Sequence, residues 1–196
     1  MKSRREFIEV LRDHNKLPHF ARSDFLKELN ELADASFAKG TVEGYLAALL
    51  IYHQLCEEFL RVLVKTSHFY VQCALFPQQI EDKKIKKKMT FGELLWEYEK
   101  TVQLDESAEF IKKCKQLNQI RVNMVHKITL KSSVASISKQ TQRCKQLFEQ
   151  IWELFDSIYD NLCGVLGDYR KNIEDFEEIA NELEPLPEQS RTTRSS

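Results

Sequence analysis

An arginine and a histidine five residues apart, Arg121 and His126, are the residues of this 196-residue chain that most strongly suggest chemistry. A guanidinium group stays charged at any physiological pH, whereas an imidazole titrates near neutrality. Such a pair suits attack on a phosphodiester, in which the arginine stabilises charge on the phosphate and the histidine transfers a proton. The segment reads RVNMVH from 121 to 126, so Asn123 adds a polar side chain between the two.

Helical geometry makes this pair an incomplete site. Arg121 lies near the middle of an apolar stripe with helical spacing, and a charge facing a core is costly unless a polar or anionic group meets it. On an ideal helix His126 is rotated about 140° from Arg121 and lies about 7.5 Å further along the axis. A functional site therefore needs a helix end or bend near His126, a long reach by Arg121, or a partner subunit. The stripe consists of Phe110, Cys114, Leu117, Met124 and Ile128.

Ordinary structural roles are the alternative for both residues. An arginine at a helix interface commonly pairs with a buried carboxylate, and a histidine commonly caps the C-terminal end of a helix.

The composition predicts a single all-α domain. With 42% apolar residues but only 5 Gly and 4 Pro, the chain can bury one sizeable core and has few turns. Helix-forming residues dominate, and no alternating run bounded by glycine indicates a sheet. We expect a helical bundle of about five to six helices over residues 1–184. The composition of residues 185–196, rich in Pro, Ser, Thr and Arg, predicts a disordered tail.

Periodicity and capping residues predict where the helices lie. The expected ranges are 3–14, 23–40, 42–73, 90–96, a fifth from 105 or 107 to about 128, and a sixth from about 136. Ser23, Thr41 and the Thr90 to Glu93 pair are expected to cap three of them. Gly164 and Gly167 predict a kink or break in the sixth helix, whose apolar stripe resumes over 169–180. Residues 78–89 are expected to form an exposed connection.

The second helix offers four candidates for burial, Phe25, Leu29, Leu32 and Phe37.

Several features predict a cytoplasmic protein without a membrane segment. The N-terminus shows no apolar stretch of the signal-peptide kind, and the longest apolar run, 45–52, is too short to span a bilayer. Five scattered cysteines without a C-x-x-C pair indicate reduced, mostly buried thiols rather than a disulfide framework.

Positive charge is concentrated in the middle of a chain whose net charge is -1. Residues 83–131 contain 12 Lys and Arg but only 6 Asp and Glu. Attraction for a polyanion such as RNA would therefore be local. The candidate contacts on the predicted fifth helix are Lys112, Lys113, Lys115 and Lys127. The alternative is that these lysines only solvate a helix face and, in the run at 83–88, a loop.

Three segments resemble the HEPN superfamily (higher eukaryotes and prokaryotes nucleotide-binding). They are the long helix with LCEEFL at 55–60, the TFGELL segment at 90–95, and the span from Arg121 to His126, which matches the superfamily's signature of an Arg, four to six residues and a His. The resemblance covers about residues 41–166. It implies a helical bundle that dimerises to bring two signatures into one cleft, and a metal-independent endoribonuclease.

The resemblance also implies roles for individual residues. Arg121 would hold the scissile phosphate, and His126 would act as general acid or base while the 2′-hydroxyl attacks, leaving a 2′,3′-cyclic phosphate. Many members carry a polar residue directly after the Arg. Here that position is Val122, and Asn123 would supply the polar contact one residue later.

Acidic residues on the long helix are supporting candidates. Glu57 and Glu58 would flank the cleft, with His53 one turn earlier, and a carboxylate there would orient His126 or pair with Arg121. The alternative is an ion pair, for example with Arg61. No His, Cys or carboxylate spacing indicates a metal site, and no Gly-rich loop indicates a nucleotide cofactor, so we expect neither.

Two functions are consistent with the sequence. The first is an RNA-cleaving protein that acts as a homodimer, as a toxin with an antitoxin partner or in phage defence. The second is a non-catalytic helical module that binds a nucleotide, RNA or protein through the same cleft. The complete Arg and His pair favours the first, whereas Val122 and the near-neutral net charge favour the second.

Overall fold

The computed structural model confirms the all-α class and describes residues 3–78, 89–102, 104–130 and 133–183. Within these ranges it contains α-helices and two 3-10 turns but no β-strand. None of the described helices is long and apolar enough to cross a membrane. The helices are α1 Arg4–Arg12, α2 Ser23–Ala38, α3 Val42–Leu75, α4 Phe91–Glu99, α5 Ser107–Lys127, α6 Val134–Lys171 and α7 Ile173–Leu183, and the 3-10 turns are η1 His14–Lys16 and η2 Ile128–Leu130.

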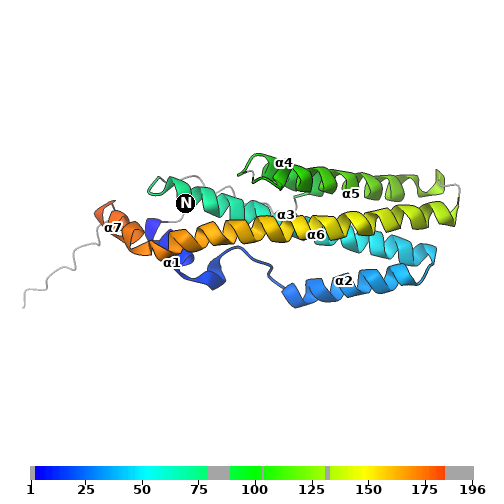
Figure 1. Cartoon of the computed structure of the whole chain (residues 1–196), viewed down its shortest axis with the longest axis horizontal. Coiled ribbons are helices and arrows are strands. Elements are labelled where there is room, and N and C mark those ends of the chain that lie inside the picture. The colour runs from blue at the N-terminus through cyan, green and yellow to red at the C-terminus, as the bar shows by residue number, and fades with distance from the viewer. Residues whose placement is uncertain (1–2, 79–88, 103, 131–132, 184–196) are drawn as a thin grey trace, which may run out of the picture.

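Helices α3 and α6 form the centre of the bundle and run parallel along most of its length (Figure 1). Tyr52 and Phe59, one heptad apart on α3, pack against Phe148 and Phe155, one heptad apart on α6, with ring centroids 4.9 and 4.7 Å apart. The repeat of seven residues on both helices keeps the same faces in contact over successive turns. These aromatic pairs therefore define the register of the two longest helices.

The remaining helices of the bundle pack around this pair. Helix α2 lies antiparallel to α3 after a turn at Gly40, whose φ of +69° is the left-handed conformation that favours glycine. Helix α5 runs back along both α3 and α6, and α4 packs on α3 and α5. The predicted caps at Thr41 and Thr90 are present, and Thr90 and Glu93 form the expected capping box. Four of the five cysteines are buried.

Helix α2 differs from its predicted packing. The buried residues are Ala33 and Ser36, while the predicted Phe25 and Leu32 are 43% and 52% exposed. Leu29 and Phe37, the other two candidates, are partly buried against the core. The reason is that α2 packs closely on a single helix, α3, so that small residues face the contact and larger ones lie beside it. The cap was also wrong, because Ser23 is already helical and the N-cap residue, Arg22, makes no side-chain capping bond.

Helix α6 continues through Gly164 and Gly167 without the predicted break. Leu162 and Leu166 are buried on the opposite side of these turns, and their packing offsets the low helix propensity of glycine. The chain breaks later, at Asn172, before α7 begins. The predicted tail at 185–196 and most of the predicted connection at 78–89 lie outside the described residues.

A second apolar cluster closes one end of the bundle. Leu11 and Leu17 pack there with Phe69 and Cys73 of α3 and with Leu166 of α6. Helices α1 and α7 contact each other at this end (Figure 1) and are also joined by an ion pair between Arg12 and Glu177. The two terminal helices thus cover the end farthest from the α5 to α6 connection.

We predict that Gly44→Ala destabilises the protein by about 1–3 kcal/mol, measured by urea denaturation. A Cβ atom at Gly44 would lie 2.3 Å from the carbonyl oxygen of Ser36, so α2 and α3 would have to separate. Gly164→Ala is the matched control. Nothing lies within 4 Å of a Cβ atom there, and the change should stabilise α6 by about 0.5–1 kcal/mol. Equal effects of the two substitutions would contradict this account of the α2–α3 contact.

Candidate functional site

Helix α5 presents one face to the core, as its apolar stripe predicted. Phe110, Cys114, Leu117 and Met124 on this face are fully buried. At the start of the helix the buried Ser107 hydroxyl lies 3.0 Å from the Tyr98 hydroxyl, which ties α5 to α4. The rotation of α5 about its axis is therefore fixed by packing at both ends of the stripe.

Arg121 lies on this inward face, and no carboxylate of the described residues pairs with it. Its side chain is partly buried, and its Nε atom is buried and has no hydrogen-bond partner among the described residues. An unpaired donor in such a place is unusual, because nearly all buried polar groups in proteins are hydrogen-bonded. Within the described part of the chain the sequence alternative, an ion pair with a buried carboxylate, is not formed.

Two polar residues accompany Arg121 between α5 and α3. Asn118 lies one turn earlier on α5, on the same face as Arg121. Its Oδ1 atom is 3.1 Å from Nε2 of His53, a buried side chain of α3. The ring of His53 stacks on Phe91 of α4 with centroids 4.5 Å apart. Helices α5 and α3 thus contribute to one polar cluster, which we call the Arg121 cluster and define as Arg121, Asn118 and His53.

Electrostatics favour a neutral imidazole in this cluster. Burial lowers the pKa of His53 from its ordinary value of 6.5, and the nearby charge of Arg121 lowers it further, although the Asn118 hydrogen bond and Glu57 act in the opposite direction. Since Asn118 Oδ1 can only accept, a neutral His53 donates from Nε2. Arg121 is then the main source of positive charge in the cluster.

His126 does not join Arg121 within one chain. Helix α5 ends at Lys127, so His126 lies in its last turn, where it is exposed, as is Lys127. In the described residues neither His126 nor Asn123 makes a side-chain hydrogen bond or ion pair. The helix neither ends nor breaks between residues 121 and 126, so the rotation of about 140° between the two side chains remains.

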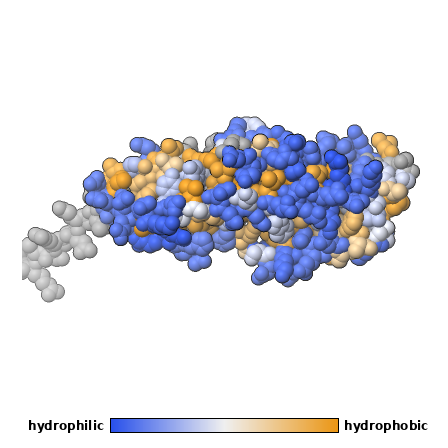
Figure 2. Space-filling model, in the orientation of Figure 1, coloured by the Kyte–Doolittle hydropathy of each residue, from blue (hydrophilic) through white to orange (hydrophobic). Residues whose placement is uncertain are grey.

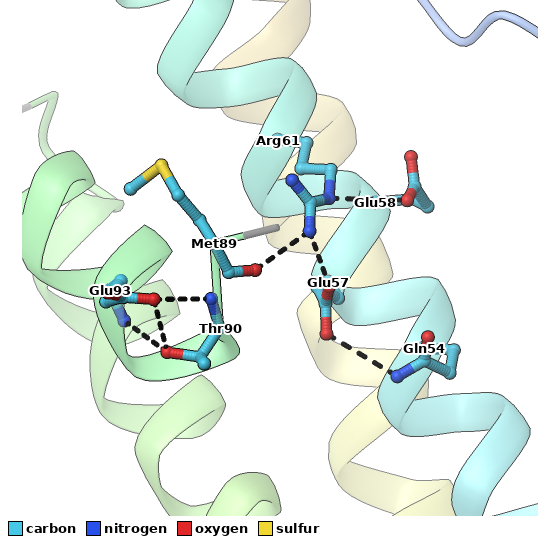
Figure 3. A network of polar contacts seen from close by, with 7 residues as sticks. All are labelled: Gln54, Glu57, Glu58, Arg61, Met89, Thr90 and Glu93. Carbon is cyan, nitrogen blue, oxygen red and sulfur yellow. Dashed lines mark hydrogen bonds and ion pairs between the residues drawn. The ribbon is translucent and has the colours of Figure 1, made fainter. Parts of the chain in front are cut away.

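Glu57 and Glu58 are paired with Arg61 on their own helix (Figure 3). The Arg61 guanidinium lies 2.7 Å from Glu57 and 3.5 Å from Glu58, and it donates to the carbonyl oxygen of Met89 at 2.9 Å. This is the ion-pair alternative considered for these glutamates. The network fixes the entry to α4 beside its Thr90 capping box and occupies the carboxylate of Glu57.

The predicted RNA-binding lysines are divided between paired and unpaired residues. Lys112 and Lys113 both lie 3.0 Å from Glu109, and Lys115 pairs with Glu99 of α4. These carboxylates reduce the attraction of three lysines for a polyanion. Lys127 is exposed beside His126 and has no ion-pair partner among the described residues.

The two cavities described for this protein lie away from Arg121. One, of about 260 Å³, lies between α2 and α6 and contains Asp34, which accepts hydrogen bonds from Tyr52 at 2.5 Å and Lys145 at 2.6 Å. Burial alone would raise the pKa of Asp34, but these two contacts lower it below its ordinary value. The other, of about 250 Å³, is a groove between the start of α2 and α3, lined by apolar residues and by Arg22, Gln54 and Glu58. Among the described residues no group of three or more His, Cys, Asp or Glu side chains is arranged to hold a metal.

Comparisons with protein-family models, with curated proteins and with solved structures gave no match.

Sequence reasoning found Arg121 but not its two neighbours. Asn118 could have been found, because it precedes Arg121 by three residues and shares its helical face. His53 was noted only for its spacing to Glu57, since the contact with Asn118 joins residues 65 positions apart. No local pattern indicates such a contact.

We predict that His53 makes the protein less stable in acid. Because its pKa is lowered in the folded state, the unfolded chain binds a proton at higher pH, and unfolding is favoured as pH falls below about 6.5. Above that pH the contribution of His53 is constant. Urea denaturation between pH 8 and 5 should show that the wild type loses more stability than His53→Gln. The exposed His14, changed to Gln, is the control and should follow the wild type; coincident curves for all three proteins would rule out this effect of His53.

Proposed function

We propose that the protein is a metal-independent endoribonuclease that acts as a homodimer. The observation that carries the proposal is Arg121: it places a permanent charge on the largely apolar inward face of α5, and its buried Nε atom has no partner among the described residues. A group of this kind suits an anionic ligand, and a phosphodiester offers the charge and acceptors it lacks.

The proposed reaction follows the resemblance to the HEPN superfamily. Arg121 stabilises charge that builds on the phosphate oxygens while the ribose 2′-hydroxyl attacks phosphorus. His126 transfers the proton as general base or acid, and the leaving group departs as a 5′-hydroxyl from a 2′,3′-cyclic phosphate. Asn123, in place of the polar residue that usually follows the Arg, and Lys127 would make supporting contacts with the RNA.

A second copy of the chain would supply the His126 that each Arg121 needs. Apolar side chains are exposed beside His126, with Val125 41%, Leu130 79% and Val134 51% accessible. Figure 2 shows hydrophobic surface at the end of the bundle where α5 meets α6. A twofold axis there would place two signatures near each other and cover this surface. A toxin neutralised by an antitoxin, or a phage-defence protein, is the biological role that fits such an activity.

The alternative is a non-catalytic module that binds RNA, a nucleotide or a protein. Val122 after Arg121 and the separation of Arg121 from His126 on one chain favour it. It predicts binding that depends on Arg121 without any cleavage.

The first test is RNA cleavage by the pure protein in EDTA. Arg121→Ala and His126→Ala should each reduce cleavage by at least about 100-fold, because they remove charge stabilisation and proton transfer. His14→Ala, an exposed histidine at the other end of the bundle, should retain full activity. Product ends should be 2′,3′-cyclic phosphates. Equal cleavage by all four proteins would indicate a contaminating nuclease, and binding without cleavage would favour the non-catalytic module.

The second test concerns the dimer. The wild type should be dimeric at micromolar concentration in sedimentation velocity, and Val125→Glu should shift it to monomer and reduce cleavage, because a charge cannot be buried in an apolar interface at low cost. Val165→Glu is the matched control, since Val165 is equally exposed at 41% but lies near the other end of α6. A wild type that stays monomeric, or the same shift in both variants, would exclude a dimer through this surface.

A further inference from the structure

The Asn118 side chain is oriented by His53. An asparagine amide has an oxygen that only accepts and an NH₂ group that only donates, and the two ends point in different directions. Here the oxygen, Oδ1, lies 3.1 Å from His53 Nε2. A neutral His53 that donates from Nε2 selects this orientation over the flipped one, in which two donors would face each other. The NH₂ group of Asn118 is therefore directed away from His53.

Two donors on α5 have no acceptor in the part of the chain that the structure describes. The Asn118 NH₂ group makes no hydrogen bond with any described residue, and neither does the buried Nε of Arg121. The two residues are three positions apart and therefore adjacent on one helix face. The carboxylate of Glu57 on α3, which acts electrostatically on His53, is held by Arg61 at 2.7 Å. No described residue thus accepts from either donor, and the Arg121 side chain is only partly buried even though its Nε atom is covered.

We propose that the Asn118 NH₂ group and the Arg121 guanidinium form a phosphate-binding subsite between α3 and α5, and that His53 is its positioning residue. The subsite rests on the proposed function only in taking an RNA phosphodiester as its ligand. Free inorganic phosphate has the same chemistry and is the other source of the ligand.

The hydrogen-bond donors of the subsite are the reason for proposing phosphate as its ligand. The subsite offers only N–H donors and one full positive charge, which suits an oxyanion with several acceptor oxygens. A carboxylate-bearing ligand would satisfy one donor pair, whereas phosphate oxygens can meet donors on two successive turns. The neutral His53 adds no second charge, and its ring stacks on Phe91.

His53 acts on the ligand indirectly, and substitutions can separate this role from its contribution to packing. Its side chain is only 4% exposed, so it acts on the ligand through Asn118 rather than by contact. Glutamine at this position retains an N–H donor for Asn118 Oδ1, whereas leucine retains only apolar packing. The charged groups near His53 are Arg121 of α5 and Glu57 of its own helix, and both are unchanged by these substitutions.

The test is the affinity of each variant for two probes, inorganic phosphate and a short single-stranded oligonucleotide with 2′-deoxy sugars that prevent cleavage. Asn118→Asp keeps an acceptor for His53 but replaces the donor with a carboxylate oxygen beside Arg121. We expect it to bind both probes at least tenfold more weakly, since a hydrogen bond to a charged group is lost and a like charge is added. Gln119→Glu adds the same charge on the next residue, which is exposed, and should bind within about twofold of the wild type.

The His53 variants test positioning. His53→Leu should weaken binding of both probes severalfold, and His53→Gln should restore it. Equal weakening in both would show that His53 does not act by donating to Asn118. Should His53→Leu fail to fold, as judged by its thermal melt, Asn118→Asp and His53→Gln still decide the outcome.

The subsite and the nuclease can fail separately. If Asn118→Asp and Gln119→Glu bind both probes equally well, the subsite is wrong, even if RNA cleavage depends on Arg121 and His126. If phosphate binding follows the expected order but RNA is never cleaved, the subsite stands and the nuclease is wrong. Binding of phosphate but not of the oligonucleotide would identify a small anion as the ligand and overturn the RNA assignment.

Discussion

The parallel pairing of α3 and α6 through stacked aromatic rings is the constraint on which the rest of the structure depends. Phe59 lies at its centre, with Phe155 stacked 4.7 Å away and Trp152 edge-on at 5.3 Å. Rings of this size contribute a large share of the apolar area that a small domain buries. Because the contacts repeat every seven residues on both helices, a slip of one residue would remove every ring from its partner. Two long helices in fixed register then provide the surfaces on which α2, α4 and α5 pack.

That register determines which way α5 faces. Since α5 packs against both α3 and α6, its buried stripe must point between them, and Arg121 is carried inward with the stripe. The arginine consequently lies on the same helix face as Asn118, which is hydrogen-bonded to His53. His126, five residues later, is carried outward by the same rotation. In the proposed function, a twofold partner would let one rigid helix use both side chains at one phosphate.

Glutamates compensate much of the positive charge on α3 and α5, so only a few cationic groups there are unpaired among the described residues. Lys112, Lys113 and Lys115 are held by glutamates, and Arg61 is held by Glu57 and Glu58. Such pairing weakens the long-range attraction of these cationic groups for a polyanion. Arg121 makes no such pair in the described residues. Recognition of a phosphate would then depend more on a few placed donors than on a general positive field.

The sequence by itself determined the features that depend on neighbours along the chain. Capping by Thr41 and Thr90, the helical period of the α5 stripe and the inward position of Arg121 follow from hydrogen bonds and side-chain spacing within a few residues. For the same reason the all-α class and most helix ranges could be predicted. Glycines misled the prediction for α6, since local propensity indicates a break where buried leucines on the opposite face keep the helix intact.

Only the tertiary structure decided the contacts between distant segments. Gly44 approaches Ser36 closely, and Phe25 and Leu32 are exposed on α2, although their spacing resembles that of a buried face. The bond between His53 and Asn118 likewise requires α3 and α5 to lie antiparallel in one particular register. Periodicity identifies which face of a helix is buried but not which helix covers it or at what height. That information comes from the packing of the whole core. The packing places His53 near Arg121 within the chain, whereas His126 faces outward.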